Sequence, residues 1–85
     1  MFLHTTHVNA LSYHRLQLRF NNGLEGVVDL SQELWGKVFE PLKDEALFAT
    51  ARQCEVMGTV VWANGADFAP EFLLDLLHAQ TLQAA

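Results

Sequence analysis

The sequence has 85 residues, of which 51% are hydrophobic, and a formal net charge of −5. A chain of this length and composition predicts a single domain over residues 1–85 with its own core, and it excludes an intrinsically disordered protein. The acidic balance, with five basic residues scattered along the chain, also predicts no direct binding of nucleic acid, because that affinity comes largely from Lys and Arg neutralising phosphates.

The first half of the chain predicts three strands. Residues 3–11 are rich in β-branched and small residues, which favours a strand. Residues 14–20 and 24–30 each alternate apolar and polar side chains, the pattern of half-buried strands. We therefore expect the last two segments to form a β-hairpin.

The register of this hairpin follows from its faces. A three-residue loop at 21–23 pairs Leu18 with Gly26 and sets Arg19 opposite Glu25, whereas a two-residue loop would place apolar residues opposite polar ones. The longer loop is a type I turn followed by a residue in the left-handed conformation, which suits Gly23. We therefore predict the three-residue loop and a positive φ at Gly23.

The middle of the chain predicts two short helices. Ser31 can cap a first helix that runs through Trp35, and Asp44 can cap a second from Glu45 to Ala51. Residues 52–56 look extended, and a turn at 57–58 follows them.

The most informative stretch runs from Gly58 to Leu77. It begins with a β-branched and aromatic strand at 59–62, which Asn64 and Gly65 end because both tolerate positive φ. Pro70 is suited to the first position of a helix. The sequence therefore predicts a C-terminal helix from Pro70 to about residue 81 or 82.

Together these elements predict an α+β fold. We expect an antiparallel sheet of four or five strands, covered on one face by the C-terminal helix, with a short helical insertion between residues 31 and 51.

The same stretch resembles a known family. The segment WANGADFAPEFL, beginning at Trp62, is similar to the C-terminal signature of the bacterial "domain of unknown function 2442" proteins. The resemblance extends through residues 7–11, 22–23, 26–30 and 39–44 and so covers nearly the whole chain. Members often have Pro where this chain has Ala63. The residues that carry the signature here are Trp62, Asn64, Gly65, Asp67, Pro70 and Glu71.

The resemblance implies no established activity and no catalytic role for the signature residues. Members look like small accessory proteins, some encoded beside a small partner in toxin–antitoxin-like pairs and some with an added helix-turn-helix segment. This chain has no room for that segment before Ala85, so we expect a protein partner and no direct contact with DNA.

The histidines do not predict a metal site. His4 and His7 are three residues apart, and on a strand this spacing points the side chains to opposite faces. No second cluster of Cys or His completes a zinc site, and His14 and His78 are isolated. We therefore predict no metal site and no bound cofactor.

Three carboxylates recur at a spacing of four, and the first two belong to the signature: Asp67, Glu71 and Asp75. Such groups can do acid–base work, so a small enzyme or ligand-binding domain using Asp67, Glu71 and a histidine is the alternative function. A solvated helix face is the preferred interpretation, because no nucleophile or histidine accompanies them.

Two apolar residues are the candidates for an interaction surface. Trp35 stands beside Gly36 in an irregular segment, whereas Trp62 lies on a strand and is expected to pack in the core. The C-terminal helix carries more apolar residues than one stripe needs, which leaves Leu74 toward the edge or outside. A deeply embedded helix and a homodimer or partner surface both remain open. The function we predict is a non-catalytic protein-interaction module, either antitoxin-like or a regulatory accessory subunit.

The single cysteine, Cys54, forms no internal disulfide, which is typical of a reducing compartment. Glu55 disfavours its thiolate, so a small buried hydrophobic residue is a better interpretation than a nucleophile. The sequence has no apolar run of the length of a signal peptide or a membrane span. We therefore expect a soluble cytoplasmic protein without membrane contact.

Overall fold

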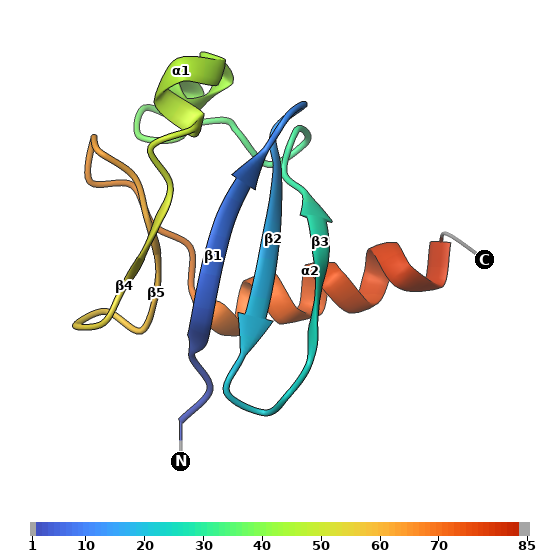
Figure 1. The fold of residues 1–85 in the computed structure, drawn as a ribbon. Helices are drawn as coiled ribbons and strands as arrows, with labels where there is room; N and C mark the ends of the chain where they lie inside the picture. Colours follow the sequence, from blue (N-terminus) through green and yellow to red (C-terminus); the bar gives the residue numbers. More distant parts are fainter. Residues whose placement is uncertain (1, 84–85) are drawn as a thin grey trace.

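The computed structural model describes residues 2–83 and has an α+β fold with two separate antiparallel sheets (Figure 1). The first contains β1 (Thr5–Leu11), β2 (Arg15–Phe20) and β3 (Glu25–Asp29), in that order. The second pairs β4 (Arg52–Cys54) with β5 (Thr59–Val61). The helices are the 3₁₀ helix η1 (Glu40–Lys43), α1 (Glu45–Phe48) and α2 (Pro70–Gln83).

The α+β class is therefore confirmed, whereas a single sheet of four or five strands is wrong. Two side-chain hydrogen bonds and one backbone hydrogen bond, rather than a continuous backbone ladder, join β1 to the second sheet. The Gln53 amide donates from Nε2 to the Thr5 carbonyl oxygen at 2.6 Å, and the Thr5 hydroxyl donates to Gln53 Oε1. The Thr5 amide donates to the Gly58 carbonyl at 3.0 Å. These bonds satisfy the first residue of β1 without continuing the sheet.

The predicted hairpin register is confirmed. Leu18 pairs with Gly26 and Arg19 with Glu25, and the Phe20 amide donates to the Leu24 carbonyl at 2.8 Å. Gly23 has a φ of 88°, as the three-residue loop requires.

Replacing Gly23 with alanine should lower the free energy of unfolding by about 1 kcal/mol, because a Cβ is penalised in the left-handed region. No atom lies within 4 Å of the Cβ position, so the cost is backbone strain alone. Urea denaturation measures it. An unchanged stability would show that the loop adopts another conformation in solution.

The prediction of a helix at residues 31–35 is wrong. Asp29 Oδ1 accepts a hydrogen bond from the Ser31 amide at 2.8 Å, and the Glu33 amide donates to the Leu30 carbonyl, so this segment is a turn. The Asp29 side chain therefore caps the Ser31 amide, and Ser31 does not act as a helix cap.

The second short helix is confirmed at its start but is shorter than expected. Asp44 accepts from the Ala46 amide at 3.1 Å, as an N-cap does. α1 ends at Phe48, because the Thr50 and Ala51 amides bond three residues back and the Thr50 hydroxyl donates to the Leu47 carbonyl.

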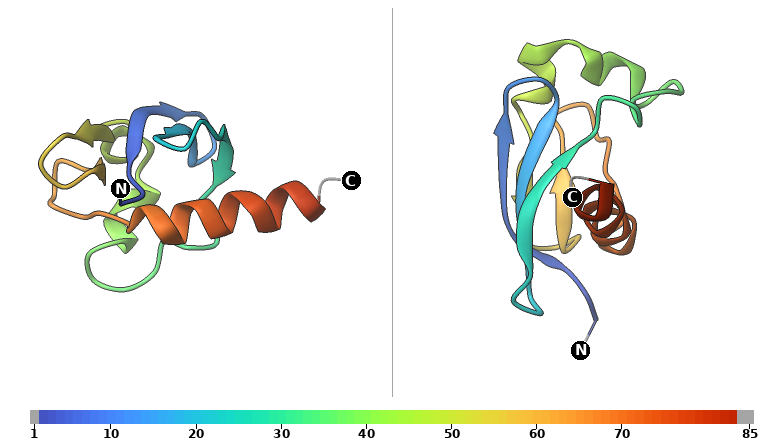
Figure 2. Two further views of the ribbon diagram at one scale, coloured as in Figure 1. Left: turned by 90° about the horizontal axis from the view of Figure 1, so that it is seen from below. Right: turned by 90° about the vertical axis from the view of Figure 1, so that its right-hand side faces the viewer.

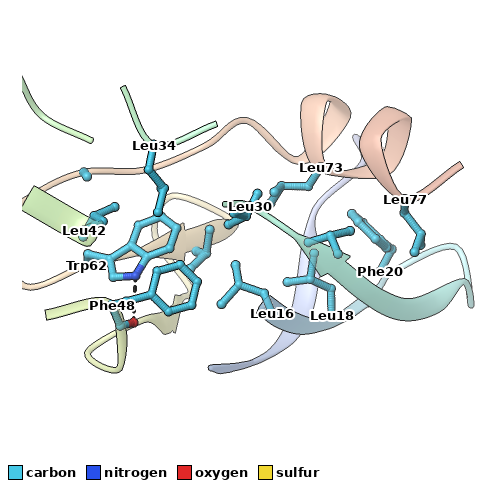
Figure 3. Close-up of a cluster of buried hydrophobic side chains, with 13 residues drawn as sticks. Leu16, Leu18, Phe20, Leu30, Leu34, Leu42, Phe48, Trp62, Leu73 and Leu77 are labelled. Carbon is cyan, nitrogen blue, oxygen red and sulfur yellow. Dashed lines mark hydrogen bonds between the residues drawn. The ribbon is translucent and has the colours of Figure 1, made fainter. Parts of the chain in front are cut away.

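The core lies between the three-stranded sheet and α2, which runs across one face of that sheet (Figure 2). Leu16, Leu18 and Phe20 of β2 point toward the helix, and Leu73 and Leu77 meet them from α2 (Figure 3). At the other end of this core, the Trp62 indole lies beside Phe48 and donates from Nε1 to its carbonyl at 2.9 Å. Trp62 is 2% exposed, which confirms its expected place in the core.

The C-terminal helix begins at Pro70, as predicted. Its Leu73 amide donates to the Ala69 carbonyl, the bond expected at the first turn. Within residues 2–83, no helix has both the length and the apolar character that crossing a membrane requires.

Candidate protein-interaction groove

A groove of about 270 Å³ lies between the turn after β3 and the start of α2. Its walls are mostly aromatic, and two carboxylates stand among them. The lining residues are Glu33, Trp35, Phe39, Asp67, Phe68, Ala69 and Phe72. We call this feature the aromatic groove.

Three phenylalanine rings form a nearly parallel stack in the wall of the groove. The ring centroids of Phe39 and Phe68 are 4.5 Å apart at 14°, and those of Phe68 and Phe72 are 5.2 Å apart at 18°. Trp62 meets Phe68 edge-on at 5.8 Å. Aromatic pairs of this geometry stabilise one another by about 0.5–1.5 kcal/mol each. The wall is therefore anchored to the core through Trp62.

The turn after β5 holds one side of the groove in place. Gly65 has a φ of 88°, and Asn64 Oδ1 accepts from the Ala66 amide at 3.1 Å. Asn64 Nδ2 also donates to the Val38 carbonyl at 3.0 Å, which ties the segment containing Trp35 to this turn. Asn64 thus joins two parts of the chain that are 26 residues apart.

The segment before α2 is fixed to β5. Asp67 forms an isolated antiparallel bridge with Val61, and the Thr59 hydroxyl donates to the Phe68 carbonyl at 2.6 Å. Pro70 then begins α2, so that Phe72 stacks on Phe68 from the first turn of the helix. Of the signature residues, Asp67 therefore lines the groove, while Trp62, Asn64 and Pro70 position the segments that form its walls.

The two predicted contact residues have different environments. Trp35 is 72% exposed and lines the groove. Leu74 is half-buried, packs against the core cluster and does not line the groove. Phe72, which is also on α2, is more exposed than Leu74, with an exposed fraction of 38%. The apolar surface near the groove therefore comes from Trp35 and Phe72.

The charges that line the groove are all negative. Glu33 and Asp67 are half-buried and line it, and Glu71 is exposed in the first turn of α2. No Lys or Arg is among the lining residues. The positive end of the α2 dipole is offset by Asp67 and Glu71.

Asp67, Glu71 and Asp75 do not form a metal site in the described part of the chain. Asp67 is half-buried, while Glu71 and Asp75 are exposed on α2. His78 follows on that helix but does not line the groove. Across residues 2–83, no three His, Cys, Asp or Glu side chains lie close enough to hold a metal ion.

The remaining histidines lie elsewhere. His4 Nδ1 is 3.2 Å from the Phe2 carbonyl oxygen, and His7 is exposed on β1. His14 contacts the Lys43 carbonyl at 2.8 Å and Glu45 at 3.6 Å. The structure therefore brings no histidine together with Asp67 and Glu71.

The sequence interpretation missed the phenylalanines of the groove. Phe68 and Phe72 are four residues apart across the helix start, and this spacing was a signal for a pair. No comparable signal links Phe39 to them, because it lies 29 residues before Phe68.

The family model described as "Protein of unknown function (DUF2442)" matches residues 5–79. The chain belongs to the DUF2442 family. This confirms the resemblance that the signature from Trp62 onward indicated. The family description assigns no function, and no curated protein matches the sequence.

A solved structure similar to this chain is named "Putative DNA Binding Protein NE0471" and comes from Nitrosomonas europaea ATCC 19718. It is 30% identical to this DUF2442 chain with a TM-score of 0.64, and the match covers 74% of this chain and 41% of that one. The chain thus spans less than half the length of this neighbour.

The name of this neighbour overturns the expectation that the chain has no direct contact with nucleic acid. That expectation relied on the net charge of −5, on the scattered basic residues and on the lack of room for a helix-turn-helix segment, none of which excludes contact through individual basic side chains. Arg15 and Arg19 alternate with buried residues on β2, so they lie on the sheet face opposite α2.

Proposed function

We propose that residues 1–85 of this DUF2442 protein form a single, non-catalytic domain that binds another protein through the aromatic groove. In this proposal it acts in the cytoplasm as an accessory subunit, either regulatory or antitoxin-like. The observation that carries the proposal is Trp35, which is 72% exposed and lines a groove whose other walls are phenylalanine rings.

The composition of the groove supports this function. Binding energy at protein interfaces is concentrated in a few residues, and Trp and other aromatic residues are enriched among them. Here Trp35 and Phe72 are exposed beside the half-buried rings of Phe39 and Phe68. A tryptophan exposed to water does not contribute hydrophobic stabilisation to the monomer, whereas a partner that covers it buries a large apolar area.

Replacing Trp35 with alanine should abolish capture of the native partner, because it removes the most exposed aromatic surface of the groove. The measurement is quantitative affinity capture from the native cytoplasm, with wild type and variant at equal concentration. Tyr13→Ala is the matched control, since Tyr13 is 77% exposed and does not line the groove. Sedimentation of the purified protein tests whether the partner is a second copy of the chain. A Trp35→Ala protein that captures the same partner as fully as wild type would disprove the proposal.

A second candidate function is contact with nucleic acid through the open face of the three-stranded sheet. The name of the N. europaea neighbour favours it, and so do Arg15 and Arg19 on β2. His7, Asn9 and Gln17 lie on the same polar face, where a shallow pocket of about 210 Å³ opens. Arg19 also forms an exposed ion pair with Glu25 at 2.9 Å. To bind DNA, the Arg19 guanidinium would therefore leave the Glu25 carboxylate and pair with phosphate groups.

For this candidate, the double substitution Arg15→Ala and Arg19→Ala should weaken binding to a fluorescent DNA duplex by at least about tenfold, and added salt should weaken the binding of the wild type. Fluorescence anisotropy measures both effects. Lys37→Ala is the control, since Lys37 lies outside the sheet. A duplex that binds the wild type and the double variant equally would rule out this face.

A further inference from the structure

The two carboxylates in the aromatic groove have no partner of their own. Glu33 and Asp67 are both half-buried, and in the described residues 2–83 neither side chain makes an ion pair or a hydrogen bond. The backbone of Asp67 is held by its bridge to Val61, so its carboxylate stays at the groove. A carboxylate without a partner in its own chain can accept charge-assisted hydrogen bonds from an approaching cation.

The size of the groove matches side chains better than a free small molecule. Its volume of about 270 Å³ is below the roughly 300–1,000 Å³ typical of small-molecule sites. The aromatic walls provide apolar contact, and the carboxylates provide negative charge on the same surface. A chain segment with an apolar side chain next to a basic one satisfies both.

We propose that the occupant is a segment of a partner protein in which an apolar side chain is flanked by Lys or Arg. This inference rests on the proposed function and specifies the chemistry of its partner. The apolar side chain packs against Trp35 and Phe72, and the basic side chains pair with Glu33 and Asp67.

A second copy of this chain is a poor occupant. In a two-fold dimer through the groove, the same surface of each copy faces the other, so Glu33 and Asp67 would meet the carboxylates of the partner copy. Each copy also carries a net charge of −5, and like charges across an interface are unfavourable. The charge therefore favours a different, basic partner over self-association.

The test uses three nine-residue synthetic peptides with a central Leu, flanked by Lys in the first, Ser in the second and Glu in the third. Titration monitored through the Trp35 indole N–H signal in the NMR spectrum gives the three dissociation constants. We expect the Lys peptide to bind at least about tenfold more tightly than the Glu peptide, with the Ser peptide between them. Trp35→Ala should abolish binding of all three.

The double substitution Glu33→Gln and Asp67→Asn is the decisive variant, because it removes charge while keeping shape. It should bring the three peptides to nearly equal affinity. Equal affinities in the wild type, a preference that survives the double substitution, or no binding of any peptide would each overturn the inference. The proposed function fails separately, only if Trp35→Ala retains its native partner.

Discussion

Replacing Trp62 with alanine is expected to lower the free energy of unfolding by about 3–5 kcal/mol. A chain of 85 residues has a total stability of roughly 4–13 kcal/mol, so the variant should be largely destabilised. The indole is 2% exposed, contacts the rings of Phe48 and Phe68, and donates a hydrogen bond to the Phe48 carbonyl. Its removal leaves a cavity and removes one of the two hydrogen bonds to the Phe48 carbonyl, which still accepts from the Ala51 amide.

The control is Trp62→Phe, which keeps most of the volume and loses the indole donor. It should cost about 0.5–1.5 kcal/mol, the net contribution of one hydrogen bond, because the Phe48 carbonyl still accepts from the Ala51 amide. Urea denaturation of both variants separates packing from hydrogen bonding. If Trp62→Ala costs less than about 1 kcal/mol, Trp62 does not anchor the groove to the core.

Replacing Leu73 with alanine should cost about 2–5 kcal/mol, because its side chain is fully buried between α2 and the three-stranded sheet. Phe72 is the adjacent residue and the matched comparison. It is 38% exposed, so Phe72→Ala should cost only about 1 kcal/mol through loss of the ring pair with Phe68.

The two variants should also differ in binding. Phe72→Ala should weaken partner capture while the protein remains folded, and Leu73→Ala should act on stability first. Thermal denaturation and affinity capture of both proteins measure this contrast. Equal losses of stability would show that Phe72 belongs to the core and would remove it from the contact surface.

Local patterns in the sequence were sufficient for much of the fold. The alternation along residues 14–20 and 24–30 determined the register of β2 and β3, since a shift by one residue would turn Leu18 away from the helix. Pro70 marked the start of α2 correctly. Both features depend on neighbours in the chain, so a single sequence carries them.

Features that depend on distant residues were not predictable. One contact that joins β1 to the second sheet is the Gln53 amide binding Thr5, which lies 48 residues away. The turn after β3 results from Asp29 accepting from Ser31, although Ser31 itself is a common helix cap. The aromatic groove requires Phe39 to stack on Phe68, and no local pattern indicates that contact.

That Trp35 and Leu74 form a contact surface stays a prediction, whereas the structure does give the burial of both side chains. Trp35 beside Gly36 was identified from its irregular context, and its side chain is exposed. Leu74 was selected because α2 carries a surplus of apolar residues, but it packs against the core cluster. The surplus is accommodated because Leu74 and Leu76 both pack against the core cluster, a tertiary contact that the sequence does not reveal.

The central claim is that the aromatic groove is covered by a protein partner in the cell. The most direct measurement places a photo-crosslinking amino acid at position 35 of the full chain, irradiates cells that express it, and identifies the adducts by mass spectrometry. Position 56 is the control, because Val56 is 93% exposed and lies outside the groove. We expect one discrete protein adduct from position 35 and none of that mass from position 56. No adduct from position 35, or the same adducts from both positions, would contradict the claim.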